Sequence, residues 1–254
     1  MTCAILTPWW RRRSPGSGLV ADEAGLLAET RILDWRHELV RALARRARQE
    51  AAPGGSERSF LIAAHRLISA GIRPVYAMDD EQPVSRTIAL GRGSCSQRLA
   101  VLEAAARIAG IQTRVRGLLV DGSLWYPRFP RLRFLVPDRV VLAWPEFRID
   151  GEWTGVSELY GSLDELGAKN PRGFTNSGGQ TLFEALASTA VDWDGSAGVC
   201  GADGGCADYD LSAAVRADLG RYTSRDELFT RHGQTLCATA RAVSGPFLSK
   251  RAAA

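Results

Sequence analysis

A cysteine preceded by two glycines has the setting best suited to covalent chemistry in this 254-residue sequence. In the segment GRGSCSQR (residues 91–98), Gly91 and Gly93 lead into Cys95, which we expect to open a helix. The positive end of a helix and the nearby Arg98 both stabilise a thiolate, the reactive form of cysteine. Backbone N–H groups at the helix start can also stabilise an oxyanion. Cys95 is therefore a candidate nucleophile, and the alternative is a buried structural cysteine.

Helices are expected on both sides of this segment, because apolar residues recur there at helical spacing. They cover residues 21–50, a stretch after PGGS (53–56) that stops at Gly71, and a stretch from about Cys95 to Ala109. The end of the first helix is rich in arginine, which suits the negative C-terminal end of a helix. Two or three further short helices are expected to finish the chain.

Strands are expected before and after the Cys95 helix. Their composition marks residues 72–78, 111–120, 139–144 (RVVLAW) and 146–150 (EFRID). Asp150-Gly151 is a tight-turn signal, so a hairpin into EWTGV is predicted. The period-two alternation of a strand places Arg114 and Arg116 on one face of the segment 111–120.

Two blocks of sequence carry a family resemblance. The run GSCSQRLAVLEAAARIAGIQTRVRGLL (93–119) precedes the run VLAWPEFRIDGEWTGVS (141–157). Together and in this order they resemble the transglutaminase-like superfamily of papain-type cysteine enzymes. In that family a Gly-x-Cys opens a helix, a GI-x-x-R strand follows, and the second block reads HAW-x-E … W-x-x-V-D. The resemblance implies an α+β fold whose Cys-bearing helix packs on an antiparallel sheet, with extra N- and C-terminal helices and with Cys95 as the nucleophile.

The sequence departs from the family at the two residues that would assist the cysteine. Leu142 stands where the family has its catalytic His, and Ser157 stands where it has its Asp. Leucine can neither accept the thiol proton nor protonate a leaving group. The sequence has three histidines: His37 is expected to face solvent, and His65 to be a partly buried structural residue. His232 is the outside candidate for the missing base.

The chain is unusually rich in arginine, with 30 arginines and two lysines. Net charge is +3 over residues 1–50, +5 over 51–150 and −4 over 151–254. Arginine binds carboxylate, sulfate and phosphate through its planar fork, so an arginine-lined cleft for an anionic ligand is predicted. A genomic bias toward arginine codons and a solvated basic surface are the alternatives. The predicted substrate-binding residues are Arg98, Arg114, Arg116, Arg128, Arg131, Arg133, Trp144 and Glu146.

Several classes of protein are disfavoured. There is no recognised nucleic-acid module, phosphate-binding loop or dinucleotide fingerprint, so neither nucleic acid nor a cofactor is expected. The Gly-rich loop with Cys200 and Cys206 has neither the close cysteine pairs nor the histidines usual in a metal site, so no metal is expected. No secretory signal or transmembrane stretch occurs. The five cysteines are expected to be mostly free thiols in the cytoplasm.

Three functions remain open at this point. The first is a modified enzyme that performs acyl transfer or amide chemistry through Cys95 on an anionic or carrier-bound acyl or amino-acyl substrate, in bacterial natural-product biosynthesis. The second is cyclisation or elimination of a sulfate or phosphate group in an arginine-lined cleft without a cysteine nucleophile. The third is an inactive binding or scaffold subunit, and a partner subunit is possible in each. The predicted organisation is a flexible basic tail (1–20), a helical region plus the core (21–160), and an extension of the same domain (161–254).

Overall fold

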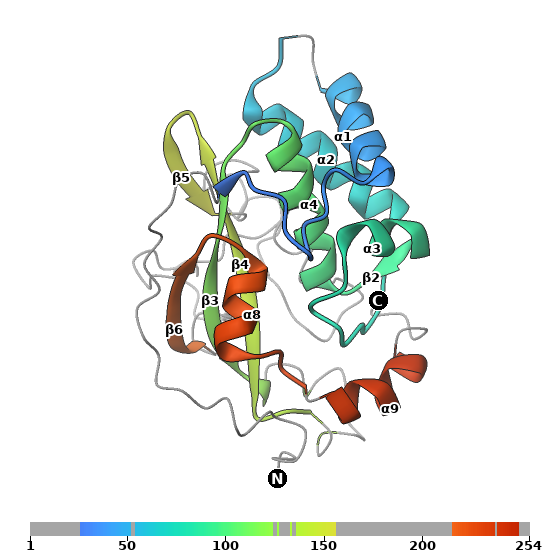
Figure 1. The fold of residues 1–254 in the computed structure, drawn as a ribbon, viewed down its shortest axis with the longest axis vertical. Helices are drawn as coiled ribbons and strands as arrows, with labels where there is room; N and C mark the ends of the chain where they lie inside the picture. The colour runs from blue at the N-terminus through green and yellow to red at the C-terminus, as the bar shows by residue number, and fades with distance from the viewer. Residues whose placement is uncertain are drawn as a thin grey trace, which may run out of the picture.

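The computed structural model describes residues 26–51, 54–123, 126, 133, 136–155, 215–236 and 238–248 (Figure 1). The basic tail predicted for residues 1–20 lies outside this part of the chain. The helices described are α1 (Glu38–Glu50), α2 (Glu57–Gly71), α3 (Val84–Leu90), α4 (Cys95–Ile108), α8 (Arg225–His232) and α9 (Ala238–Leu248). The strands described are β1 (Arg73–Pro74), β2 (Arg92–Gly93), β3 (Thr113–Asp121), β4 (Arg139–Ile149), β5 (Glu152–Gly155) and β6 (Val215–Tyr222).

An antiparallel sheet with the strand order β5-β4-β3-β6 forms one side of the molecule. The longest ladder joins β3 to β4 in unbroken register from Thr113 opposite Phe147 to Asp121 opposite Arg139. The predicted hairpin is confirmed, because Asp150 (φ 52°) and Gly151 (φ 87°) form a tight turn between β4 and β5. A separate pair of short parallel strands, β1 and β2, lies before α4.

Helix α4 lies at the centre of the core, between the sheet and helices α1, α2 and α3 (Figure 1). Every residue from Gln97 to Arg107 is buried. A helix covered on all sides needs apolar or small residues around most of its circumference, and the run LAVLEAAARI supplies them except at Glu103 and Arg107, which have polar partners. The α+β class is therefore confirmed, with a Cys-bearing helix packed against an antiparallel sheet.

The first helix is shorter than predicted, since α1 begins at Glu38 and not near residue 21. The apolar residues Ile32 and Leu33 are fully buried, but they lie in a turn and not in a helix. In this turn the Thr30 hydroxyl accepts a hydrogen bond from the Leu33 amide, and His37 then caps α1. Local side-chain hydrogen bonds of this kind compete with helix formation.

The two strands predicted for residues 139–144 and 146–150 form a single strand, β4. Proline removes one ladder N–H but tolerates extended backbone geometry, so β4 continues through Pro145 opposite Val115. The segment predicted as a strand over 72–78 pairs only at Arg73–Pro74. A strand also occurs where only helices were expected, because β6 joins the sheet beside β3. Two register shifts in that ladder interrupt the alternation by which a strand is identified in a sequence.

None of the helices in the described part of the chain combines the length and the apolar character needed to cross a membrane.

A glycine on β3 gives a test of this packing. A Cβ atom added at Gly117 would lie 2.5 Å from a methyl group of Leu228 in α8, and 3.1 Å from the Cβ of Leu219. Overpacking of this kind costs about 1–3 kcal/mol. We expect Gly117→Ala to lower the free energy of unfolding by that amount in urea denaturation. As the matched control, Gly71→Ala at the end of α2, where no atom lies within 4 Å, should be neutral or slightly stabilising. Equal effects of the two substitutions would contradict this packing.

Candidate active site around Cys95

A capping box fixes the start of α4. The Ser94 hydroxyl accepts from the Gln97 amide (3.2 Å), and the Gln97 side chain accepts from the Ser94 amide (3.0 Å). Gly93 is needed just before this cap, since a Cβ atom there would lie 2.8 Å from a methyl group of Thr87. Cys95 is the first residue of the helix, is partly exposed and forms no disulfide bond with a described residue. The sequence prediction of a cysteine that opens a helix is therefore confirmed.

Two loops that are distant in the sequence meet at this end of α4. The side-chain amide of Gln97 donates to the carbonyl of Asp79 (2.8 Å), and so attaches the loop before α3 to the helix. The buried Gln234, which follows α8, accepts from the Asp80 amide (2.9 Å). The next residue, Thr235, accepts from the Val141 amide of β4 (3.1 Å). The start of α4 is therefore surrounded by the 79–82 loop, the 233–236 loop and β4.

The guanidinium of Arg225 connects the elements around the site. It is fully buried and donates from Nε to Oε1 of the equally buried Glu103 on α4 (2.6 Å). Its Nη1 donates to the hydroxyl of Ser96 (2.9 Å), and its Nη2 donates to the carbonyl of Ala143 on β4 (3.4 Å). One side chain of α8 therefore holds the first turn of α4, its middle and the adjacent strand in a fixed relation. No feature of the local sequence marks this arginine, because its partners lie more than 80 residues away.

A carboxyl group with a perturbed pKa lies in this network. The Asp80 side chain accepts a hydrogen bond from Ser96, and burial raises its pKa to about 6, although Arg225 and that hydrogen bond act in the opposite direction. Burial likewise raises the pKa of Glu103, while Arg225 opposes the shift. Carboxyl groups with such shifts are frequent at functional sites. Asp80 was not among the residues predicted from the sequence, where DDEQP (79–83) indicated only a loop.

The residue at the position of the family's catalytic His is apolar. Leu142 is buried on β4 opposite Leu118 of β3, and Ser157 lies outside the described residues. The outside candidate, His232, is bound through Nε2 to the Tyr222 hydroxyl (2.7 Å). That hydroxyl donates its proton to the Leu219 carbonyl (2.6 Å), so the histidine Nε2 must carry a proton. Burial lowers the pKa of His232, and its described contacts tie it to β6.

The other two histidines have structural positions. His37 caps α1, with its Nδ1 accepting from the Leu39 amide (3.2 Å). His65 is buried on α2, more completely than the sequence predicted.

Four of the predicted substrate-binding residues meet on one face of the β3–β4 ladder. Arg114 lies opposite Glu146, and Arg116 lies opposite Trp144. Arg114 forms an ion pair with Glu146 and stacks on Trp153, with 4.0 Å between the guanidinium carbon and the ring centre.

Two partners on β6 extend this group. Arg116 pairs with Asp218 (2.8 Å), and Arg221 adds a second cation to Glu146 (3.0 Å). The carboxylates of the protein itself therefore already pair with the two predicted arginines of this face.

The remaining predicted arginines do not join this group in the described structure. Arg98 is fully buried in α4, one turn from Cys95. The Arg133 guanidinium lies 5.9 Å from the centre of the Tyr126 ring. Arg128 and Arg131 lie outside the described residues, as does the loop with Cys200 and Cys206. Among the residues that the structure describes, no cluster of three metal-ligating side chains occurs.

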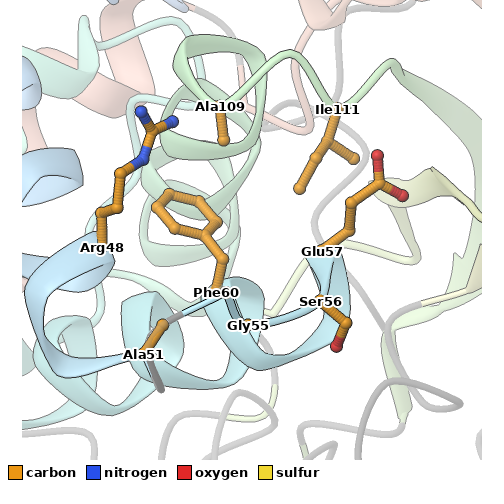
Figure 2. Close-up of a pocket in the computed structure, with 9 residues that line it drawn as sticks. Arg48, Ala51, Gly55, Ser56, Glu57, Phe60, Ala109 and Ile111 are labelled. Atoms are coloured by element: carbon orange, nitrogen blue, oxygen red, sulfur yellow. The ribbon is translucent and has the colours of Figure 1, made fainter.

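A surface hollow of about 360 Å³ lies at the opposite end of α4. Its lining comes from the end of α1, the start of α2 and the residues after α4 (Figure 2). Helix α4 has 14 residues, which at about 1.5 Å per residue gives a length of about 20 Å. The hollow is thus separate from the site at Cys95. The residues that line it are Arg48, Ala51, Gly54, Gly55, Ser56, Glu57, Phe60, Ala109 and Ile111.

Removal of one partner of the buried ion pair tests the role of Arg225. We expect Glu103→Leu to lower the free energy of unfolding by about 3–5 kcal/mol, because it leaves a buried cation without its carboxylate. On the surface of α1, Glu50 forms an exposed pair with Arg46 (3.0 Å), so Glu50→Gln should cost less than about 1 kcal/mol. Chemical denaturation measures both variants, and a Glu103→Leu variant no less stable than the control would contradict this role.

Comparison with known proteins places this site in a family. The model of the transglutaminase-like superfamily matches residues 41–157, a segment that contains Cys95 and Leu142. No curated protein matches the chain in sequence. A crystal structure of a proposed cysteine protease from Cytophaga hutchinsonii is similar over 54% of this chain, with 17% identity and a TM-score of 0.38, and the match spans 42% of that protein. Residues 41–157 are thus similar to the transglutaminase-like superfamily, and this segment holds Cys95 at the start of the central helix.

Proposed function

We propose that this protein is an acyl-transfer enzyme that uses Cys95 as its nucleophile. The observation that carries the proposal is the setting of Cys95, the partly exposed first residue of α4 within the segment that matches the family. A helix N-terminus stabilises a thiolate and presents N–H groups to a developing oxyanion. The capping box and Gly93 hold the backbone in this geometry.

The reaction has two half-steps. The Cys95 thiol loses its proton, and its sulfur attacks the carbonyl carbon of an acyl or amino-acyl donor. The tetrahedral oxyanion collapses to a thioester as the leaving group departs with a proton. An amine or water then attacks the thioester, which releases the product and restores the thiol.

We extend the proposal to an anionic or carrier-bound donor, and to bacterial natural-product biosynthesis. The support for an anionic donor is the net charge of +5 over residues 51–150, the segment that holds Cys95. The support for the biosynthetic role is the arginine- and alanine-rich composition together with a family site in which leucine replaces the histidine.

The ion pairs on β3 favour the cysteine enzyme over the cyclisation or elimination hypothesis. That hypothesis requires arginines available to a departing sulfate or phosphate. Arg114 and Arg116 instead pair with Glu146 and Asp218. The hypothesis of an inactive binding subunit is supported by the buried Leu142 at the position of the family's histidine. The alkylation experiment described next tests this hypothesis as well.

Alkylation kinetics test whether Cys95 is an activated thiol. We expect iodoacetamide at pH 7 to label Cys95 at least about tenfold faster than it labels the same cysteine in the urea-unfolded chain, because the helix N-terminus stabilises the thiolate. Peptide mapping by mass spectrometry measures the rate at each cysteine.

The matched controls are Cys95→Ala and Cys206→Ala. The first should lose the fast phase of labelling and the second should retain it. A fast phase that survives in Cys95→Ala, or a Cys95 no more reactive than in the unfolded chain, would contradict the proposal and leave the binding subunit as the better account.

A further inference from the structure

We infer that Asp80 accepts the thiol proton of Cys95, directly or through one water, in the role that histidine performs elsewhere in the family. The inference rests on the proposed function. The observation behind it is a carboxyl group held on the residue that follows the nucleophile: the Asp80 side chain is hydrogen-bonded to Ser96. No residue of the 79–83 loop has a role in the family resemblance.

The hydrogen bond to Ser96 places the Asp80 carboxyl group at the start of α4, where Cys95 also lies. Cys95 and Ser96 are consecutive, so their Cα atoms lie about 3.8 Å apart. A carboxyl group bound to the Ser96 hydroxyl therefore lies at the first turn of α4, beside the residue that follows the nucleophile. A general base must be within hydrogen-bond reach of the proton that it abstracts, or one water away.

The network fixes both the position and the direction of the hydrogen bond to Asp80. Arg225 can only donate, and its Nη1 donates to the Ser96 oxygen (2.9 Å). The single hydroxyl proton of Ser96 is then available for the Asp80 carboxylate. On the backbone side, Gln234 accepts from the Asp80 amide (2.9 Å), so the loop is held from α4 and from the segment after α8. A carboxylate that receives one hydrogen bond retains lone pairs for a further proton.

The charges that face Asp80 come from three elements. Arg225 of α8 and Arg241 of α9 favour its ionised form, and Asp79 in the same loop disfavours it. Burial outweighs them and raises the pKa of Asp80 to about 6. At pH 7 the group is therefore mostly ionised and ready to accept a proton, while it is far more basic than an ordinary aspartate. A base with a pKa near the working pH is the most effective in proton transfer.

Asp80 can accept and return each proton that the reaction transfers. In the first half-step the Asp80 carboxylate takes the thiol proton as the sulfur–carbon bond forms. The carboxylic acid then gives that proton to the leaving amine, alcohol or thiol as its bond to the acyl carbon breaks. In the second half-step the carboxylate takes a proton from the attacking amine or water, and the departing thiolate of Cys95 recovers it.

The test is the pH dependence of acylation of Cys95 by 4-nitrophenyl acetate between pH 4.5 and 8, followed by the total release of 4-nitrophenol and its anion. In the unsubstituted protein the rate should rise with pH and be half-maximal near pH 6, because Asp80 must be ionised. Asp80→Asn should slow acylation by at least about 100-fold at pH 7 and remove this midpoint. Glu81→Gln is the matched control from the same loop: Glu81 pairs with Arg31 on the surface, so the profile should not change.

Ser96→Ala provides a variant that keeps the carboxyl group. The hydrogen bond from Ser96 lowers the pKa of Asp80, so its removal should move the midpoint to higher pH. A purely structural role for Asp80 would change the amount of folded protein and not this midpoint. Near-UV circular dichroism of each variant measures the folded fraction to which its rate is normalised.

The outcomes separate this inference from the proposed function. If Cys95 is acylated and the Asp80→Asn and Ser96→Ala profiles match that of the unsubstituted protein, Asp80 is not the proton acceptor, although Cys95 remains the nucleophile. If Cys95 is not acylated in the unsubstituted protein, the proposed function and the inference both fail. If Asp80→Asn does not fold, an unchanged midpoint in Ser96→Ala overturns the inference, and a shifted midpoint supports it.

Discussion

The buried ion pair between Arg225 and Glu103 is the interaction on which the arrangement around Cys95 depends. Both side chains are fully buried, so removal of either partner would leave the other charge buried without compensation. The pair fixes the guanidinium, and the guanidinium in turn binds Ser96 on the first turn of α4 and the Ala143 carbonyl on β4. The pair therefore holds the start of α4 against the strand and the C-terminal part of the chain, together with the capping box and the contacts of Gln97 and Gln234.

The central part of the fold could be predicted from the sequence because its signals are local. The Gly-flanked Cys95, the apolar run of α4 and the Asp150-Gly151 turn each depend on residues close in sequence, and the structure shows all three as expected. The alternation that places Arg114 and Arg116 on one face is also confirmed by the register of β3 with β4. The family resemblance was carried by these same segments.

The remainder could not be predicted, since it depends on contacts across long stretches of chain. Leu33 belongs to the apolar pattern that predicted a helix from residue 21, but it is buried in the non-helical segment before α1. The strand β6 is interrupted by register shifts, and so it lacks a clear alternation. The sequence indicated only a loop at Asp80, and its environment comes from burial and from distant residues such as Ser96 of α4 and Arg225 of α8. The sequence shows the charges of Arg114 and Arg116, but it does not show that these residues pair with Glu146 and Asp218.

The replacement of histidine by leucine changes how the site must handle protons. Leu142 is buried at the position of the family's histidine, and our inference therefore assigns proton transfer to Asp80, the carboxyl group hydrogen-bonded to Ser96. The central claim is that Cys95 is the nucleophile, and mass spectrometry of the acyl-enzyme tests it most directly. After brief incubation with 4-nitrophenyl acetate and an acid quench, the account predicts one acetyl group, located on the peptide that contains Cys95. An acetyl group spread over other residues, or absent from that peptide, would contradict the account.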